Sequence, residues 1–222
     1  MTEASRTPSL SNALAVSAVT RPELSDEAKA VAGWRRVRLE EVLTEHLEAV
    51  PVEPQASYEV VGVYSFGRGL FKRAKLEGTA TSYKALHRLH AGQLVLSRLK
   101  AWEGAIAIVP DTFDGWFLSP EFPTFDIDTT RIDTEYLRSL VTTEEFWARL
   151  GGASRGIGAR RERIHAARLL EQEVNLPPLA VQRHVAQRIR SLNDADARRS
   201  AARDRIDALL PAALNEAFAS LS

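Results

Sequence analysis

The sequence predicts an α+β protein: a small, mostly antiparallel β domain with short helices, followed by one long C-terminal helix of the coiled-coil type. Two observations lead to this fold class. Between residues 58 and 128, short β-branched and aromatic runs recur about every dozen residues, separated by Gly, Pro and Asp turns. From residue 179 to residue 219 the apolar residues instead follow a helical period, interrupted only by Pro211.

The elements of the β domain can be expected in order. Residues 1–32 are rich in Ser, Thr, Ala and Pro with little periodicity, which predicts a disordered extension. The folded domain is expected over residues 33–176, and it opens at Trp34 with a short strand and a helical turn. The strands expected after it are 58–66, 94–99, 104–109, 115–118 and 122–128, with a short polar–apolar segment at 83–89 and a turn at 90–93.

Helical periodicity replaces the strand pattern between residues 133 and 150. Six apolar residues there predict two short helices, and Thr142 or Thr143 is a suitable N-cap for the second. The glycine-rich loop GGASRGIGAR then enters a short helix, RRERIHAARLLEQ, and EVNLPPL leaves it in an extended conformation. Pro177 and Pro178 lock φ and push Leu176 out of the helical region, so they form a rigid corner from which the long helix of residues 177–222 begins.

The long helix has a coiled-coil pattern at both ends and a polar middle. The same register that carries its apolar residues also passes through Asp196, Arg199 and Arg203. A helix packed along its own domain should not show that gap, so we expect it to pair with a partner helix or to lie across another subunit. The a- and d-like residues expected to make this contact are Val185, Ile189, Leu192, Ile206, Leu210 and Ala213.

Composition excludes several classes of protein. The 222 residues include 29 basic and 29 acidic side chains and no cysteine, so disulfides and thiolate metal sites are excluded and a reducing cytoplasm is expected. No secretory signal is evident, and no apolar run is long enough to span a bilayer, so no membrane partner is expected. A neutral chain argues against a free-standing nucleic-acid binder, but its local basic clusters suit a DNA contact made within a larger assembly.

Six sequence blocks occur in a recognisable order before the terminal helix. They are Trp34 with its helical turn, YEVVGVYSFGRGLFKR, K…L.AGQLVLSRLKAWEGAIAIV, DGWFLSPEFPTFDID, SRGIGARRERI and NLPPLAVQRHVAQRI. With these blocks, from about Trp34 to Phe218, the chain resembles one half of the DNA-specificity subunit of type I restriction-modification systems. Members of that family usually carry two target-recognition domains, each followed by a long helix, and the two helices pack antiparallel as a ruler between two half-sites. This chain has one domain and one helix, and it departs at residues 181–183, where the family commonly has Glu before the Gln.

The resemblance implies a non-catalytic specificity subunit that reads one half-site of double-stranded DNA. The single unit implies a half-subunit that dimerises, a truncated subunit, or a one-domain relative that serves another methylation system. The implied partners are a DNA methyltransferase subunit, a restriction or translocase subunit, and either a second copy or a second specificity chain. S-adenosylmethionine and ATP are expected only on those partner subunits, so no cofactor is expected here. The alternative is a degenerate or decoy subunit that acts as a scaffold without reading DNA.

Three segments have the chemistry of DNA contacts. In FGRGLFKRAK, glycines allow close approach to phosphate, although a hairpin turn with solvated cations is an equal alternative. In SRLKAWEGA, strand alternation predicts two cations and Trp102 on one face, although a place in the core is favoured for Trp102. SRGIGARRERI predicts an anion site at a helix start, or else arginines paired with nearby glutamates. The residues expected to contact DNA, of which Lys84 and Ser154 come from the resemblance alone, are Arg68, Lys72, Arg73, Lys84, Arg98, Lys100, Ser154, Arg155, Arg160, Arg161 and Arg163.

No residue set in the sequence predicts catalysis or a metal site. His87 and His90 are three residues apart, but no acid shares a helical face with them. There is no thiol nucleophile and no serine in a nucleophile elbow, and EFPTFDID lacks the Lys of a PD…ExK nuclease core. The glycine-rich loop lacks the Lys-Ser/Thr of a P-loop, and NLPP is not a methyltransferase motif. We therefore expect a protein that is not an enzyme.

Overall fold

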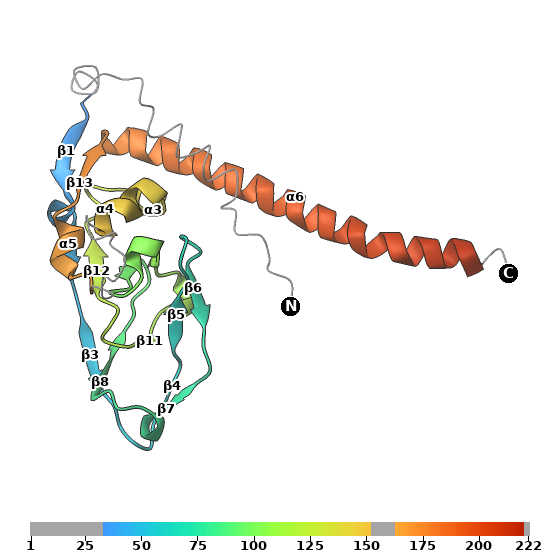
Figure 1. Ribbon diagram of the computed structural model, residues 1–222. Coiled ribbons are helices and arrows are strands. Elements are labelled where there is room, and N and C mark those ends of the chain that lie inside the picture. Colours follow the sequence, from blue (N-terminus) through green and yellow to red (C-terminus); the bar gives the residue numbers. More distant parts are fainter. Residues whose placement is uncertain (1–32, 152–162, 220–222) are drawn as a thin grey trace, which may run out of the picture. The chain divides into compact units, whose positions relative to one another are not determined.

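The computed structural model describes residues 33–151 and 163–219, with side chains described up to residue 207 and at residue 209 (Figure 1). The chain divides into two compact units. Among the described residues, one is the β-rich unit, which ends at Arg183, and the other contains the helix from His184 onward. The first turn of the long helix therefore belongs to the β-rich unit.

The β-rich unit is built from short antiparallel strands. A four-stranded sheet has the order β10 (Ile106–Ile108), β9 (Leu94–Leu96), β12 (Thr124–Ile127) and β2 (Leu43–Glu45). A three-stranded sheet has the order β11 (Phe117–Leu118), β8 (Ala85–Arg88) and β3 (Glu48–Pro51). Three strand pairs complete the unit: β1 (Arg35–Arg38) with β13 (Glu173–Leu176), β4 (Ser57–Tyr58) with β7 (Leu76–Glu77), and β5 (Val61–Val63) with β6 (Leu70–Lys72). The predicted antiparallel α+β fold is confirmed.

The apolar core lies on both faces of the four-stranded sheet. Ile106 pairs with Leu96, and both are fully buried on one face, where β10 packs against α3 (Thr134–Val141). Ala107 pairs with Val95, and both join the apolar cluster on the other face, which also includes Val61 of β5. Because both faces are covered, these strands read as continuous apolar runs rather than as an alternating pattern.

The helices α3 and α4 (Glu144–Gly151) of the β-rich unit are close to those predicted, whereas the last helix is shorter than predicted, because residues 163–165 are not helical. Asp133 caps α3 by accepting hydrogen bonds from the backbone N–H groups of Glu135 and Tyr136. In α4, the Thr143 hydroxyl accepts from the N–H of Phe146, which agrees with the predicted cap. The last short helix is α5 (Ala166–Leu170). Single 3-10 turns lie at η1 (Leu39–Glu41), η2 (Gly78–Ala80), η3 (Ala101–Glu103) and η4 (Asp111–Phe113).

Two of the predicted strands are wrong in extent. The run at 58–66 is divided between β4 and β5, because Tyr58 pairs with β7 whereas Val61 pairs with β6. The strand predicted to reach Leu99 ends at Leu96, and η3 follows it. Residues 98–102 therefore do not alternate across a strand, and the face predicted from alternation is not formed there.

The long helix α6 runs from Leu179 to Ala219, as predicted. Its 41 residues correspond to a length of about 60 Å. Its first turn is tied to the β-rich unit by Gln182, whose side chain is 1% exposed. Among the described residues, no helix is both long enough and apolar enough to cross a membrane.

Candidate nucleic-acid interface

The turn between β5 and β6 presents a basic and aromatic segment at the end of the hairpin. The N–H of Tyr64 donates to the carbonyl oxygen of Gly69 at 2.9 Å and closes the turn. Gly67 and Gly69 have φ of 64° and 81°, and Phe66 has φ of 64°, a left-handed conformation that a side chain with a Cβ rarely adopts. Holding Phe66 in this conformation costs on the order of 1 kcal/mol, so the surroundings must enforce it.

Backbone hydrogen bonds to η3 enforce that conformation. The N–H of Phe66 donates to the carbonyl oxygen of Glu103 at 2.8 Å, and the N–H of Gly67 donates to that of Gly104 at 2.9 Å. The Ser65 hydroxyl also donates to the Glu103 carboxylate at 3.2 Å. The turn and η3 therefore form one surface although they lie far apart in the sequence.

A buried tryptophan supports this junction from below. Trp147 of α4 is 6% exposed, and its indole N–H donates to the carbonyl oxygen of Val141 at 2.7 Å. A Cβ added to Gly104, which has φ of 80°, would lie 2.5 Å from the Trp147 ring. A Cβ added to Gly67 would lie 3.1 Å from Thr142. Glycine is therefore required where the turn and η3 pack onto α4.

The outer side of the junction is exposed. Trp102 and Phe66 are each 46% exposed, and the Arg68 guanidinium lies 4.5 Å from the centroid of the Tyr64 ring. Trp102 is therefore not the core residue that was favoured, and its indole N–H donates to the backbone carbonyl of Leu99 at 3.2 Å. We call this area the aromatic–basic surface; it consists of Tyr64, Phe66, Arg68, Leu99, Lys100 and Trp102.

Two of the predicted DNA contacts, Arg68 and Lys100, lie on this surface. The Arg68 guanidinium is fixed on the Tyr64 ring and donates from Nε to the carbonyl oxygen of Ser65 at 3.1 Å. Lys100 lies 3.6 Å from the Glu103 carboxylate and is largely solvent-exposed. Both cations can therefore reach a ligand without leaving the surface.

Two further predicted cations meet beside this surface. Arg98 is half-buried, and its backbone N–H donates to the backbone carbonyl oxygen of Glu121 at 3.0 Å. Its side-chain Nε is buried and has no hydrogen-bond partner among the described residues. Arg163 pairs with the Glu121 carboxylate at 2.8 Å, and the N–H of Ile164 donates to the carbonyl oxygen of Arg98. Glu121 therefore holds the two arginines close together.

The other predicted DNA contacts that the structure describes lie outside the aromatic–basic surface. Lys72 is 3.8 Å from Glu59 and 5.1 Å from the centroid of the Trp116 ring. A hydrogen bond from Lys75 lowers the pKa of Glu59, with further help from the nearby Lys72 charge. Arg73 is exposed just after β6. Lys84 is also exposed, but it follows β7 and η2, and Figure 1 shows β7 at the end of the β-rich unit remote from α3 and α4.

Several predicted residues cannot be assigned to this surface. Ser154, Arg155, Arg160 and Arg161 lie outside the described residues, as do the side chains of Leu210 and Ala213. Of the predicted helix-pairing residues with described side chains, Val185 is half-buried, Ile189 is buried, and Leu192 and Ile206 are 46% and 61% exposed.

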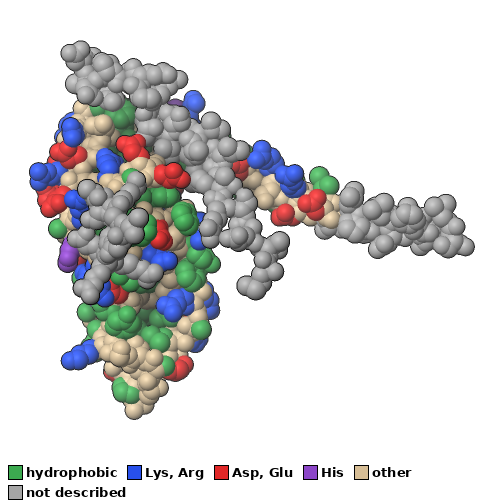
Figure 2. All heavy atoms as spheres, in the orientation of Figure 1, with side chains coloured by type: hydrophobic (Ala, Val, Ile, Leu, Met, Phe, Trp, Pro, Cys, Tyr) green, Lys and Arg blue, Asp and Glu red, His purple; other side chains and the backbone are tan. Residues whose placement is uncertain are grey.

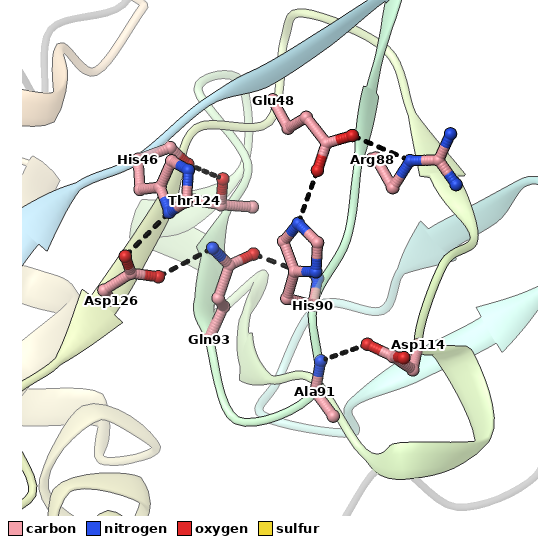
Figure 3. A network of polar contacts seen from close by, with 9 residues as sticks. All are labelled: His46, Glu48, Arg88, His90, Ala91, Gln93, Asp114, Thr124 and Asp126. Atoms are coloured by element: carbon pink, nitrogen blue, oxygen red, sulfur yellow. Dashed lines mark hydrogen bonds and ion pairs between the residues drawn. The ribbon is translucent and has the colours of Figure 1, made fainter.

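A second polar cluster joins the two larger sheets (Figure 3). His46 contacts Asp126 at 2.7 Å, and Asp126 accepts from Gln93 at 2.8 Å. His90 contacts Glu48 at 2.7 Å, and Arg88 donates to the same carboxylate at 2.9 Å. The hydrogen bond from His90, supported by Arg88, lowers the pKa of Glu48.

This cluster has the geometry of a structural connection. The Thr124 hydroxyl beside it donates to the backbone carbonyl of His46 rather than to the imidazole, so it is not held as a nucleophile. His87 is buried, and burial lowers its pKa, whereas His90 is bound to Glu48. Within residues 33–151 and 163–219, no group of three or more His, Cys, Asp or Glu side chains could hold a metal ion.

Sequence reasoning missed the apolar part of the aromatic–basic surface. Tyr64 and Phe66 fall at the end of the strand predicted over residues 58–66, and Leu99 is not among the predicted contacts. The available signal was FGRG: an aromatic residue directly before two closely spaced glycines is typical of a turn. On the face drawn in Figure 2, apolar and basic side chains are interspersed over the β-rich unit.

Comparisons with solved structures show the same fold. The HsdS subunit from Thermoanaerobacter tengcongensis matches with a TM-score of 0.62 and 23% identity, over 79% of this chain and 46% of that one. A chain from a structure on complex assembly and conformational transition of the type I restriction-modification system matches with a TM-score of 0.60 and 21% identity, over 78% of this chain and 46% of that one. The type I restriction-modification S subunit from M. genitalium matches with a TM-score of 0.50 and 9% identity, over 83% of this chain and 46% of that one.

These likenesses confirm, at the level of the fold, the resemblance seen in the six sequence blocks. The chain spans about half the length of the specificity subunits it matches. A scan against protein-family models and a search of curated proteins found no match.

Proposed function

We propose that this chain is a non-catalytic DNA-recognition subunit that reads one half-site of a duplex within a methyltransferase complex of the type I restriction-modification kind. The observation that carries the proposal is the fold, which is that of half an HsdS subunit. Fold alone does not determine function. The surface chemistry of the β-rich unit therefore has to support the same conclusion.

The aromatic–basic surface supplies that support. Arg68 and Lys100 are exposed cations that can contact phosphates, and a guanidinium can also read the major-groove edge of guanine. The aromatic rings beside them offer stacking area. Cations interleaved with exposed aromatic side chains are typical of nucleic-acid contacts.

The long helix supports a role in assembly. Leu192, Ile206 and Leu209 are all strongly exposed on α6, and their positions differ by fourteen and by three residues, which are coiled-coil spacings. We infer that α6 pairs with the same helix of a second copy or of another specificity chain. The methyltransferase subunit, and a restriction or translocase subunit, would then supply the S-adenosylmethionine and ATP chemistry.

One observation favours a second function, that of a scaffold or decoy which binds the methyltransferase without reading DNA. Three of the predicted DNA contacts, Lys72, Lys100 and Arg163, already have carboxylate partners. Exposed ion pairs of this kind contribute little to stability, so a phosphate can replace the carboxylate. The pairing therefore reduces the positive charge available for DNA without removing it.

Methylation mapping tests the proposal. The chain would be expressed with a methyltransferase subunit of the type I kind from its own source in a host that lacks adenine and cytosine methylation, and modified motifs would be read by sequencing. We expect one motif to be methylated, and we expect the Arg68→Ala, Lys100→Ala double variant to lose most of that methylation while still co-purifying with the methyltransferase.

The controls separate the two functions. Arg73→Ala and Lys84→Ala remove exposed cations away from the aromatic–basic surface and should retain more methylation than the double variant. A stable complex that methylates no motif would contradict DNA recognition and favour the scaffold.

A further inference from the structure

Phe66 and Trp102 are the two aromatic side chains of the aromatic–basic surface whose rings have no stacking partner among the described residues, and Phe66 differs from Trp102 in lying at the end of a turn. The Tyr64 ring stacks on Phe71 at 4.1 Å and lies beneath the Arg68 guanidinium. The Trp102 indole N–H is already bound to a backbone carbonyl. Phe66 is 46% exposed at the end of its turn and makes no aromatic or cation–π contact among the described residues, so its whole ring is free to contact a ligand.

The backbone holds this exposed ring in one place. Phe66 has the left-handed conformation with φ of 64°, and its N–H is bound to the carbonyl oxygen of Glu103 at 2.8 Å. The next residue, Gly67, is bound to Gly104, which packs directly on the buried Trp147 ring. A rigid support beneath an exposed aromatic ring is unnecessary for solubility, but it allows the ring to be pressed into a partner.

The charges around Phe66 favour a polyanion as that partner. Two cations, Arg68 and Lys100, lie on the surface, and two more, Arg98 and Arg163, meet beside it, while the carboxylates that pair with members of this set are Glu103 and Glu121. An apolar ring inside a cationic surface fits a ligand with a charged outer backbone and an apolar interior. Duplex DNA has this construction.

We propose that Phe66 enters the DNA as an apolar wedge between two neighbouring base pairs and that the chain thereby selects a deformable step in its target. The proposal rests on the proposed function and adds the mode of contact. Inserted Phe, Leu, Ile or Met side chains unstack a step and bend the duplex. The cost of this deformation is smallest at flexible pyrimidine–purine steps, so the sequence is read there without a hydrogen bond to a base.

The experiment uses the full chain in complex with its methyltransferase subunit and a duplex carrying the motif found by methylation mapping. One set of duplexes carries 2-aminopurine at successive positions, and another carries a fluorophore pair that reports bending. The methyltransferase takes the methylated base itself out of the stack, so only positions away from that base report the wedge. We expect one such position to become brighter on binding, together with a bend. In Phe66→Asn, which keeps a residue suited to the left-handed conformation, we expect both signals to be lost and affinity to fall about tenfold.

Two matched variants test whether the apolar side chain, rather than the neighbouring cation, causes the bend and the 2-aminopurine signal. Phe66→Leu keeps an apolar wedge and should retain the bend and most of the affinity. Arg68→Ala should weaken binding and reduce its salt dependence by about one counterion while keeping the 2-aminopurine signal.

The outcomes distinguish this inference from the proposed function. A wild-type complex that binds no duplex would contradict the proposed function and, with it, the wedge. DNA binding and bending that are unchanged in Phe66→Asn would overturn the wedge and leave DNA recognition intact. Loss of the methyltransferase from the Phe66→Asn complex would also overturn it, because the ring would then be a protein contact.

Discussion

Replacing Gln182 removes one buried amide that joins three parts of the β-rich unit. Its side-chain oxygen accepts from the N–H of Asp133 at 2.9 Å, at the start of α3. Its side-chain nitrogen donates to the carbonyl oxygens of Arg131 at 3.2 Å and of Pro177 at 2.9 Å. The amide therefore fastens the first turn of α6 to the proline corner and to the loop that precedes α3.

The cost of losing this amide follows from the three hydrogen bonds. Each contributes about 1 kcal/mol net, and each orphaned partner remains in a site from which water is largely excluded, since Gln182 is 1% exposed. Gln182→Leu keeps the volume and should therefore lower the free energy of unfolding by about 3 kcal/mol. Gln182→Ala adds a cavity and should cost about 1 kcal/mol more.

Urea unfolding followed by tryptophan fluorescence measures these differences. Gln55 is exposed, so Gln55→Leu serves as the matched control and should change stability by less than about 0.5 kcal/mol. If Gln182→Leu and Gln182→Ala each cost less than about 1 kcal/mol, the amide is not a structural fastening and the reasoning is refuted.

Gln182→Glu tests the direction in which stability should change with pH. A carboxylate would still accept from Asp133, but its second oxygen would face two carbonyl oxygens in place of a donor. Burial and this repulsion would raise the pKa of the introduced carboxyl in the folded state. The variant should therefore be least stable at neutral pH and should recover relative to wild type as the pH falls through that raised value.

Three other predictions concern the hairpin support, the polar cluster and the long helix. Gly104→Ala should lower the free energy of unfolding in urea by about 2 kcal/mol, because the added Cβ meets the buried indole. The control Gly92→Ala has a positive φ too, but its Cβ enters free space, so it should cost less. Equal losses in the two variants would contradict the packing argument. The pKa of Glu48 is lowered by a hydrogen bond from a histidine ring, so its stabilising effect is present above the unfolded value of about 4.3 and lost as pH falls through the folded value. Glu48→Gln should therefore be less stable than wild type at pH 7, with a gap that narrows towards pH 3, and a gap independent of pH would refute the assignment. Leu192→Asp with Ile206→Asp should abolish pairing through α6 while circular dichroism keeps the folded signal. Sedimentation of the chain alone and with a second specificity chain measures that pairing, and an association seen with wild type that is unchanged in the variant would refute pairing through these residues.

The fold class and the long helix could be predicted because their causes are local. Glycine and proline punctuate the β-rich unit, helical periodicity begins at Leu179, and the proline corner lies where α6 starts. Strand extents could not be predicted in the same way. Val61 and Tyr58 have similar β propensity, and only their different partner strands divide the run between them.

The site was only partly predictable, for the same reason. Charged residues can be read from sequence, so Arg68 and Lys100 were identified. The sequence could not show that the turn bearing Phe66 would dock on η3, because the hydrogen bonds that join them connect residues 66 and 67 to residues 103 and 104. It also could not show that Trp102 would face solvent, because the exposure of that side chain depends on how η3 packs against α4.

The sequence alone determined the α+β architecture, the helix with apolar ends and a polar middle, and the likeness to half a type I specificity subunit, since these depend on residue type, period and order along the chain. Only the tertiary structure decided which cations share a surface, which of them are already paired with carboxylates, and which aromatic rings of that surface have no stacking partner among the described residues. Those properties depend on distances between residues that are remote in the chain, and non-local packing sets these distances.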